Sequence, residues 1–101
     1  MNKELLNAKM ELLRAMYEDK EVWEDGSTDE FDENFTNVFG TEDVATYFTW
    51  DDQNDTFVAD EMFDTIMTTV MDIQNEGKKV TSSWSGYLGT DDILVCVLAY
   101  K

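Results

Sequence analysis

Residues 93–100, with the sequence ILVCVLAY, leave few choices for the fold. The run has the length of a β-strand, and it is apolar at both its odd and its even positions. Such a strand is expected in the middle of a sheet that is covered on both faces or nearly so. The run contains Cys96, the single cysteine of the chain, which we therefore predict to be a buried structural thiol rather than a reactive one.

Two other segments alternate with the period of two that is typical of a half-buried strand, and they are 44–50 and 78–88. Each is followed by a stretch with turn composition, DDQND after the first and GTDD after the second. We therefore predict two β-hairpins, which pair 44–50 with 56–59 and 78–88 with 93–100. Turns this short exclude crossover connections, so the sheet of about four strands is expected to be antiparallel.

Two segments have the three- and four-residue apolar spacing of amphipathic helices, 2–19 and 60–76, and Gly77 supplies the stop of the second. We expect both helices on one face of the sheet, which makes the chain a single α+β domain, 1–101. The segment 20–43 remains open between helix, strand and loop. The apolar residues expected to be buried are Leu5, Leu6, Met10, Leu12, Leu13, Met16 and Tyr17 in the first helix, Met62, Phe63, Ile66, Met67, Val70 and Ile73 in the second, and Phe35 and Phe39 between them.

Charge is the unusual property of this chain: 23 Asp and Glu against 7 Lys and Arg give a net charge of −16. Residues 21–77 contain 17 of the carboxylates and no Lys or Arg. A surface of this kind repels nucleic acid and anionic membranes and attracts cationic partners over a Debye length of about 8–10 Å. Direct binding to nucleic acid or to a membrane is therefore excluded, and with no apolar run long enough for a membrane span we expect a cytoplasmic protein.

No catalytic pattern is present. The chain has no histidine, no base for a serine or cysteine nucleophile, and no glycine-rich phosphate loop. Among 23 carboxylates a close pair will occur by chance, so paired acids carry no information about glycosidase chemistry. We therefore predict a protein that is not an enzyme and that needs no cofactor.

Calcium binding is an alternative that an acidic chain invites. The 12 residues from Asp51 place acidic or amide side chains at loop positions one, three and five, but Thr56 replaces the required glycine and Met62 the bidentate glutamate. A loop that starts at Asp25 fails at the same two positions. A divalent-cation-binding protein therefore ranks below the other functions.

Helices that carry rows of like charge lose about 0.2–0.5 kcal/mol per pair, so folding alone does not favour them. Solubility would need a net charge of about 2–8, about half of the value here. Duplex DNA presents one negative charge per about 1.7 Å of its axis. Carboxylates three or four residues apart on a helix lie about 5–6 Å apart, close to the separation of phosphates along a strand. The acids therefore indicate imitation of a nucleic acid.

The acidic composition of residues 18–76, in a small α+β domain without catalytic residues, resembles that of the DNA-mimic proteins that bacteriophages use against restriction enzymes and CRISPR effectors. No motif is shared, so the resemblance transfers no site residue. It implies a stoichiometric inhibitor that occupies the basic nucleic-acid-binding surface of a nuclease, a CRISPR effector or a transcription factor.

The alternative from the residues alone is an acidic interaction or assembly module, including a homodimer, whose apolar surface binds while the acids keep it soluble. If the protein is an inhibitor, Trp23 and Phe31 of the acidic segment are predicted to anchor the partner, because tight interfaces usually contain a few buried aromatic side chains. The predicted partner-binding residues are Glu21, Trp23, Glu24, Asp25, Asp29, Glu30, Phe31, Asp32, Glu33, Glu42, Asp43, Asp51, Asp52, Asp55, Asp60, Glu61 and Asp64. No metal ligand and no catalytic residue is predicted.

Overall fold

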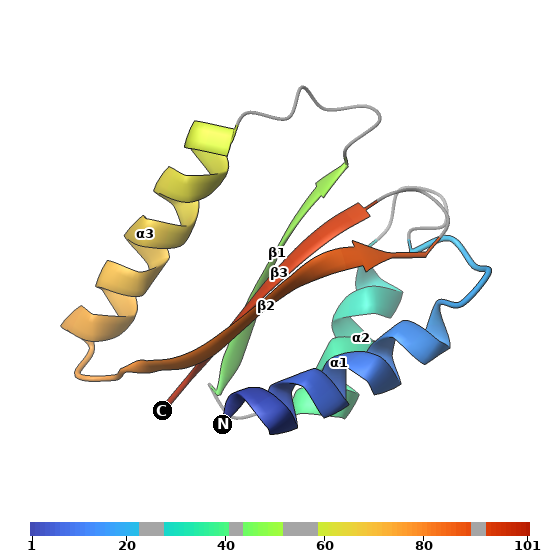
Figure 1. Cartoon of the computed structure of the whole chain (residues 1–101), viewed down its shortest axis with the longest axis horizontal. Coiled ribbons are helices and arrows are strands. Elements are labelled where there is room, and N and C mark those ends of the chain that lie inside the picture. The colour runs from blue at the N-terminus through green and yellow to red at the C-terminus, as the bar shows by residue number, and fades with distance from the viewer. Residues whose placement is uncertain (23–27, 41–43, 52–58, 90–92) are drawn as a thin grey trace.

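The computed structural model of the chain describes residues 1–22, 28–40, 44–51, 59–89 and 93–101. Within them the element order is α1 (Lys3–Met16), α2 (Asp29–Phe39), β1 (Ala45–Asp51), α3 (Ala59–Asn75), β2 (Val80–Leu88) and β3 (Ile93–Tyr100). The strands form an antiparallel sheet in the order β1-β3-β2 (Figure 1). The α+β prediction is confirmed.

β3 is the central strand of this sheet, as its composition predicts. One set of alternate residues, Ile93, Val95, Val97 and Ala99, belongs to the main core, which α1 and α2 cover. The other set faces the opposite side of the sheet, where Cys96 and Leu98 are buried outside that core cluster. Both sides of the strand are thus kept from water, and the prediction of a buried Cys96 is confirmed.

The helices do not all lie on one face, so that prediction is wrong. α1 and α2 cover one face of the sheet and α3 lies on the other (Figure 1). A strand that is apolar on both sides needs a cover for each side. Two helices on a single face would have left the Cys96 side of β3 open.

The hairpin expected between 44–50 and 56–59 is not confirmed. β1 pairs instead with β3 over its whole length, from Ala45 opposite Ala99 to Asp51 opposite Ile93. Residues 52–58 lie outside the described part of the chain, and α3 already begins at Ala59. The expected pairing of β2 with β3 is present, with an irregularity between Val80 and Ser82.

The helix ends follow the local sequence. Asn2 caps α1, because its side-chain oxygen accepts a hydrogen bond from the Leu5 N–H at 2.8 Å. α2 ends at Gly40, whose φ is +91°, and α3 ends before Gly77, whose φ is +80°. The backbone N–H of Lys78 reaches the Ile73 carbonyl at 3.1 Å, so the predicted stop at Gly77 is confirmed.

The thiol of Cys96 provides a test of the covered second face. The Cys96 side chain is buried, so a reagent reaches it poorly. Burial also raises the pKa of the thiol above the ordinary value for cysteine, so little thiolate is present at neutral pH. We expect Ellman's reagent to modify the native protein at least about tenfold more slowly than the protein in urea. Equal rates in the two conditions would show that α3 does not protect this side of the sheet.

Candidate functional site

Four carboxylates lie together on α2: Asp29, Glu30, Asp32 and Glu33, called here the α2 acidic surface. All four are exposed to solvent. The opposite side of the same helix carries Phe31, Phe35 and Phe39, which are buried in the main core. Because the three rings recur every four residues, burying them turns the intervening acids outward. Three of the acids lie in the first turn, where the helix dipole favours negative charge.

The position of α2 is held from two sides. On the sheet side, the Phe31 ring meets the Tyr47 ring of β1 at a centroid distance of 4.9 Å, edge to face. On the α1 side, the Lys9 ammonium donates a hydrogen bond to the Val38 carbonyl at 2.7 Å and lies 5.6 Å from the centre of the Phe39 ring. The α2 carboxylates are therefore carried on a rigid element and not on a loop.

Tyr17 joins the two helices at the N-terminal half of α2. Its hydroxyl oxygen accepts a hydrogen bond from the Asn34 side chain at 2.8 Å. Burial raises the pKa of this hydroxyl; the Asn34 hydrogen bond lowers it and the negative charge of Glu30 raises it further. The phenol therefore stays neutral through the physiological range.

The predicted acids on the second helix form a separate group. Glu61 and Asp64 are exposed three residues apart on α3, and Asp72 and Glu76 are exposed farther along the chain. α3 and α2 lie in opposite layers, one on each side of the sheet (Figure 1). The acids of α2 and those of α3 therefore lie on different faces of the molecule, because the sheet separates the two helices.

Phe31 was predicted to contact a partner, and this prediction is wrong. Its side chain is 0% exposed, and its ring also lies near the rings of Tyr17 and Phe35, at centroid distances of 5.7 and 6.3 Å. The residue therefore anchors α2 to the core. The predicted burial of Phe35 and Phe39 is confirmed.

The other predicted residues divide into three groups. Glu21 is exposed and precedes the buried Val22. For Asp51 and Asp60 the structure describes the backbone but not the side chain. The remaining predicted residues lie outside the described part of the chain, and they are Trp23, Glu24, Asp25, Glu42, Asp43, Asp52 and Asp55. The calcium loop considered from Asp25 is incompatible with the fold, because α2 is helical from Asp29 onward.

Sequence reasoning missed the exposed apolar side chains. On α1 the buried residues are Leu6, Met10 and Leu13, and the C-cap residue Tyr17 is also buried, whereas Leu5, Leu12 and Met16 are exposed. On α3 the exposed ones are Phe63, Met67 and Met71, of which Phe63 and Met67 were expected in the core. The sequence did contain a signal of these exposed side chains: the apolar stripe of each helix is wider than one contact with a sheet can bury.

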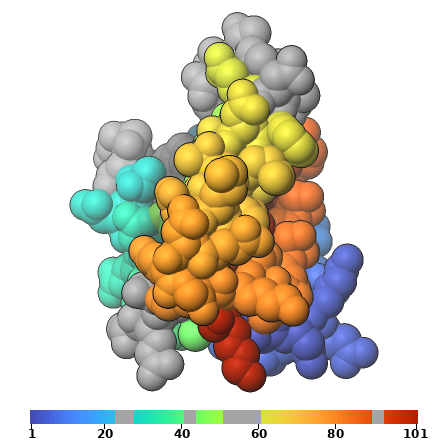
Figure 2. Space-filling model, turned by 90° about the vertical axis from the view of Figure 1, so that its left-hand side faces the viewer, coloured from blue at the N-terminus to red at the C-terminus, as the bar shows by residue number. Residues whose placement is uncertain are grey.

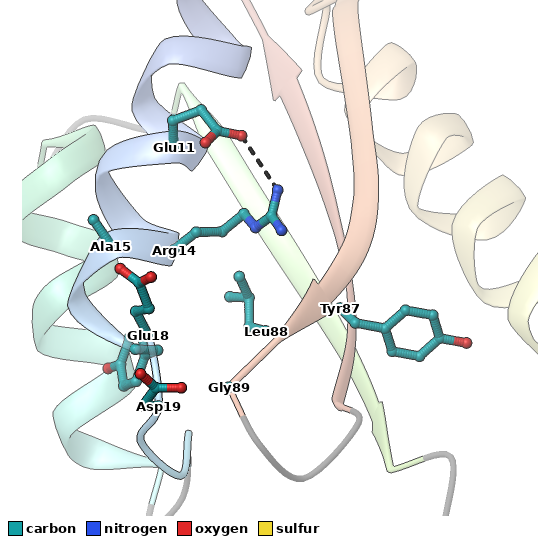
Figure 3. A pocket seen from close by; sticks show the side chains of 9 residues that line it. Glu11, Arg14, Ala15, Glu18, Asp19, Tyr87, Leu88 and Gly89 are labelled. Carbon is teal, nitrogen blue, oxygen red and sulfur yellow. Dashed lines mark hydrogen bonds and ion pairs between the residues drawn. The ribbon is translucent and has the colours of Figure 1, made fainter.

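A pocket of about 390 Å³ opens between the second half of α1 and the end of β2. Its lining includes one guanidinium, Arg14, and the carboxylates of Glu11, Glu18 and Asp19 (Figure 3). Arg14 pairs with Glu11 at 3.3 Å, and both side chains are at least half exposed, so the pair contributes little to stability. The Tyr87 ring points away from the pocket (Figure 3). The carboxylates of the lining are exposed, and its buried titratable side chain, Tyr17, is hydrogen-bonded to Asn34.

Among the described residues, no three His, Cys, Asp or Glu side chains gather closely enough to hold a metal ion. Within the same part of the chain, no helix has the length and apolar character that crossing a bilayer requires.

Comparison of the whole chain with protein-family models, with curated proteins and with solved structures found no match in any of the three.

Proposed function

We propose that this protein is a non-enzymatic inhibitor that binds the basic nucleic-acid-binding surface of another protein by DNA mimicry, in the manner of phage anti-restriction and anti-CRISPR proteins. The observation that carries the proposal is the α2 acidic surface: four exposed carboxylates within five residues, on a helix anchored by three buried phenylalanines. Its partner would be a nuclease, a CRISPR effector or a transcription factor.

The physical basis is the fixed spacing of the charges. Side chains three and four residues apart on a helix have Cβ atoms about 5–6 Å apart, so acids of α2 form a dense array. The core contacts of Phe31 and the Lys9–Val38 hydrogen bond hold the helix in place, so little entropy is lost when a partner binds. An array of Lys and Arg that neutralises phosphates would find complementary charges here.

The test is capture of the partner from a bacterial lysate on the immobilised protein, followed by elution with duplex DNA or with salt. We expect duplex DNA to release the captured protein, and the amount captured to fall at least about tenfold between about 50 and 300 mM salt. The variant D32N/E33Q, which removes two charges from the α2 acidic surface, should capture at least about tenfold less.

The matched control is D72N/E76Q, which removes the same number of charges at exposed positions on and just after α3. We expect this variant to capture as much as the unmodified protein. Equal losses from the two variants would mean that net charge alone drives binding. Capture that resists salt and duplex DNA would contradict the mimicry itself.

The second candidate is an interaction or assembly module, which the exposed Leu5, Leu12 and Met16 on α1 favour. α1 also carries charges of both signs, with Lys3 and Arg14 beside Glu4 and Glu11, so two copies could approach there with less repulsion than elsewhere. A mass of 11.7 kDa by light scattering at micromolar concentration would remove the dimeric form of this alternative.

A further inference from the structure

α3 is more apolar than its contacts require. Of its described side chains, the one that is buried is Ile73, near the C-terminal end of the helix. The residues on the same side in earlier turns, Met62, Ile66 and Val70, are half-buried. Figure 1 shows the reason: α3 is close to the sheet near the start of β2 and diverges from it toward Ala59. The helix is therefore held mainly at one end.

A second stripe on α3 is turned to solvent. Phe63, Met67 and Met71 recur every four residues and are 62%, 42% and 58% exposed, and they are called here the α3 apolar surface. At 100° per residue this stripe lies beside the sheet-facing one, so the helix is apolar over more than half of its circumference. In Figure 2 the helix stands at the front of the molecule with its outer side uncovered. The apolar stripe of α3 is thus wider than its contact with the sheet.

The polar side of α3, which begins beside the α3 apolar surface at Asp64, is acidic. Glu61, Asp64 and Asp72 are exposed on the same helix, and the sequence of α3 contains no Lys or Arg. Methionine side chains are flexible and polarisable and adapt to irregular apolar partners, and a phenylalanine supplies a larger anchor. A flexible apolar stripe beside an acidic polar side is complementary to an amphipathic helix with a cationic polar face.

A second copy of this chain is a poorer occupant. Three large side chains of roughly 200 Å² each, about half exposed, offer about 300 Å² per partner, whereas a stable interface buries about 800 Å² on each side. Each copy also carries a net charge of −16, so two copies repel. This repulsion favours a cationic partner over self-association at this surface.

We propose that the α3 apolar surface is a docking site for an amphipathic cationic helix of a partner protein. The site lies in the layer opposite the α2 acidic surface and rests on exposed apolar side chains rather than on charge density. It therefore stands independently of the DNA mimicry.

The test uses two fluorescein-labelled 18-residue peptides of the same leucine and lysine composition. One has the helical apolar period and the other has a scrambled order. We expect the protein to bind the amphipathic peptide at least about tenfold more tightly than the scrambled one at about 0.3 M salt, where contacts between exposed charges are largely screened. Fluorescence anisotropy gives both dissociation constants.

Two matched variants locate the binding. M67Q/M71Q replaces two exposed apolar side chains on α3, and L5Q/L12Q replaces two of comparable exposure on α1. Both variants should fold, since the four side chains are at the surface. We expect M67Q/M71Q to lose the preference for the amphipathic peptide and L5Q/L12Q to keep it. D32N/E33Q should also keep it, which separates this site from the α2 acidic surface.

Three outcomes would overturn the proposal. Equal binding of the two peptides at about 0.3 M salt would make the interaction electrostatic alone. A preference that survives in M67Q/M71Q, or that L5Q/L12Q abolishes equally, would place the binding elsewhere. A dimer by light scattering that becomes a monomer in M67Q/M71Q would show that a second copy occupies the surface.

Discussion

Replacing Phe31 with alanine is expected to lower the free energy of unfolding by about 3–5 kcal/mol. The ring is 0% exposed, and it lies against Tyr17 at the C-cap of α1, Phe35 of α2 and Tyr47 of β1. Its removal leaves a cavity where these three elements meet. Because a domain of this size has a total stability of about 5–15 kcal/mol, the variant should lose a large part of it. Urea denaturation followed by circular dichroism measures the change.

Phe63 provides the control, because Phe63→Ala removes the same atoms from an exposed position on α3. We expect the free energy of unfolding of this variant to stay within about 0.5 kcal/mol of the original value. A similar loss in the two variants would mean that α3 is packed against something that makes Phe63 part of the core. A small effect of Phe31→Ala would contradict the assignment of Phe31 as the anchor of α2.

Gly89→Ala is expected to have the next largest effect, a loss of about 2–4 kcal/mol. Gly89 has a φ of +69°, a conformation that side chains other than glycine rarely adopt. A Cβ atom there would also lie 2.7 Å from the backbone oxygen of Lys20 and 2.7 Å from a methyl group of the buried Val22. The end of β2 thus packs against the chain after α1 at a distance that excludes any side chain.

The contact can be separated from the backbone strain with Gly77→Ala. Gly77 has a similar φ of +80°, but a Cβ atom there would have no neighbour within 4 Å. We expect this variant to lose about 1 kcal/mol, the cost of the conformation alone. Urea denaturation of both variants gives the difference. Equal losses would show that the contact with Lys20 and Val22 can relax without cost.

The two proposed surfaces would contribute differently to binding. Charge on the α2 acidic surface accelerates association and makes it depend on salt. Apolar side chains such as Phe63 and Met67 on α3 would slow dissociation, because leaving the partner exposes them to water and breaks apolar contacts that water does not replace. Since the two helices lie on opposite sides of the sheet, one partner could engage both by enclosing the domain, or two partners could bind at once (Figure 1).

Several features could be predicted from the sequence because they depend on neighbouring residues. The apolar character of ILVCVLAY at both parities predicts a central strand with two covered faces, and β3 is such a strand. The spacing of 60–76 and the glycine after it predict α3 and its end. The run of acids without bases predicts exposed carboxylates, and the α2 and α3 carboxylates whose side chains the structure describes are exposed.

Other features were decided by contacts between distant parts of the chain. Whether 44–50 pairs with 56–59 or with 93–100 depends on which partner completes the sheet, and Ala45 lies opposite Ala99, far along the sequence. Local periodicity contains no information about that choice. The same holds for the placement of α3 on the face that α1 and α2 leave open.

The helix surfaces illustrate the same division. The apolar residues of α1 and α3 form stripes wider than one contact, so their spacing determines that the segments are helical but not which side is buried. The packing of α1 against the rest of the domain decides which side is buried: Leu6 and Leu13 face the core, while Leu5 and Leu12 face solvent. By itself the sequence determined α1, α3, the three strands, the central position of β3 and the charge, but not α2. The tertiary structure decided the strand partners, the layer of each helix and which apolar side chains remain available to a partner, because these depend on how the covered faces are shared between elements.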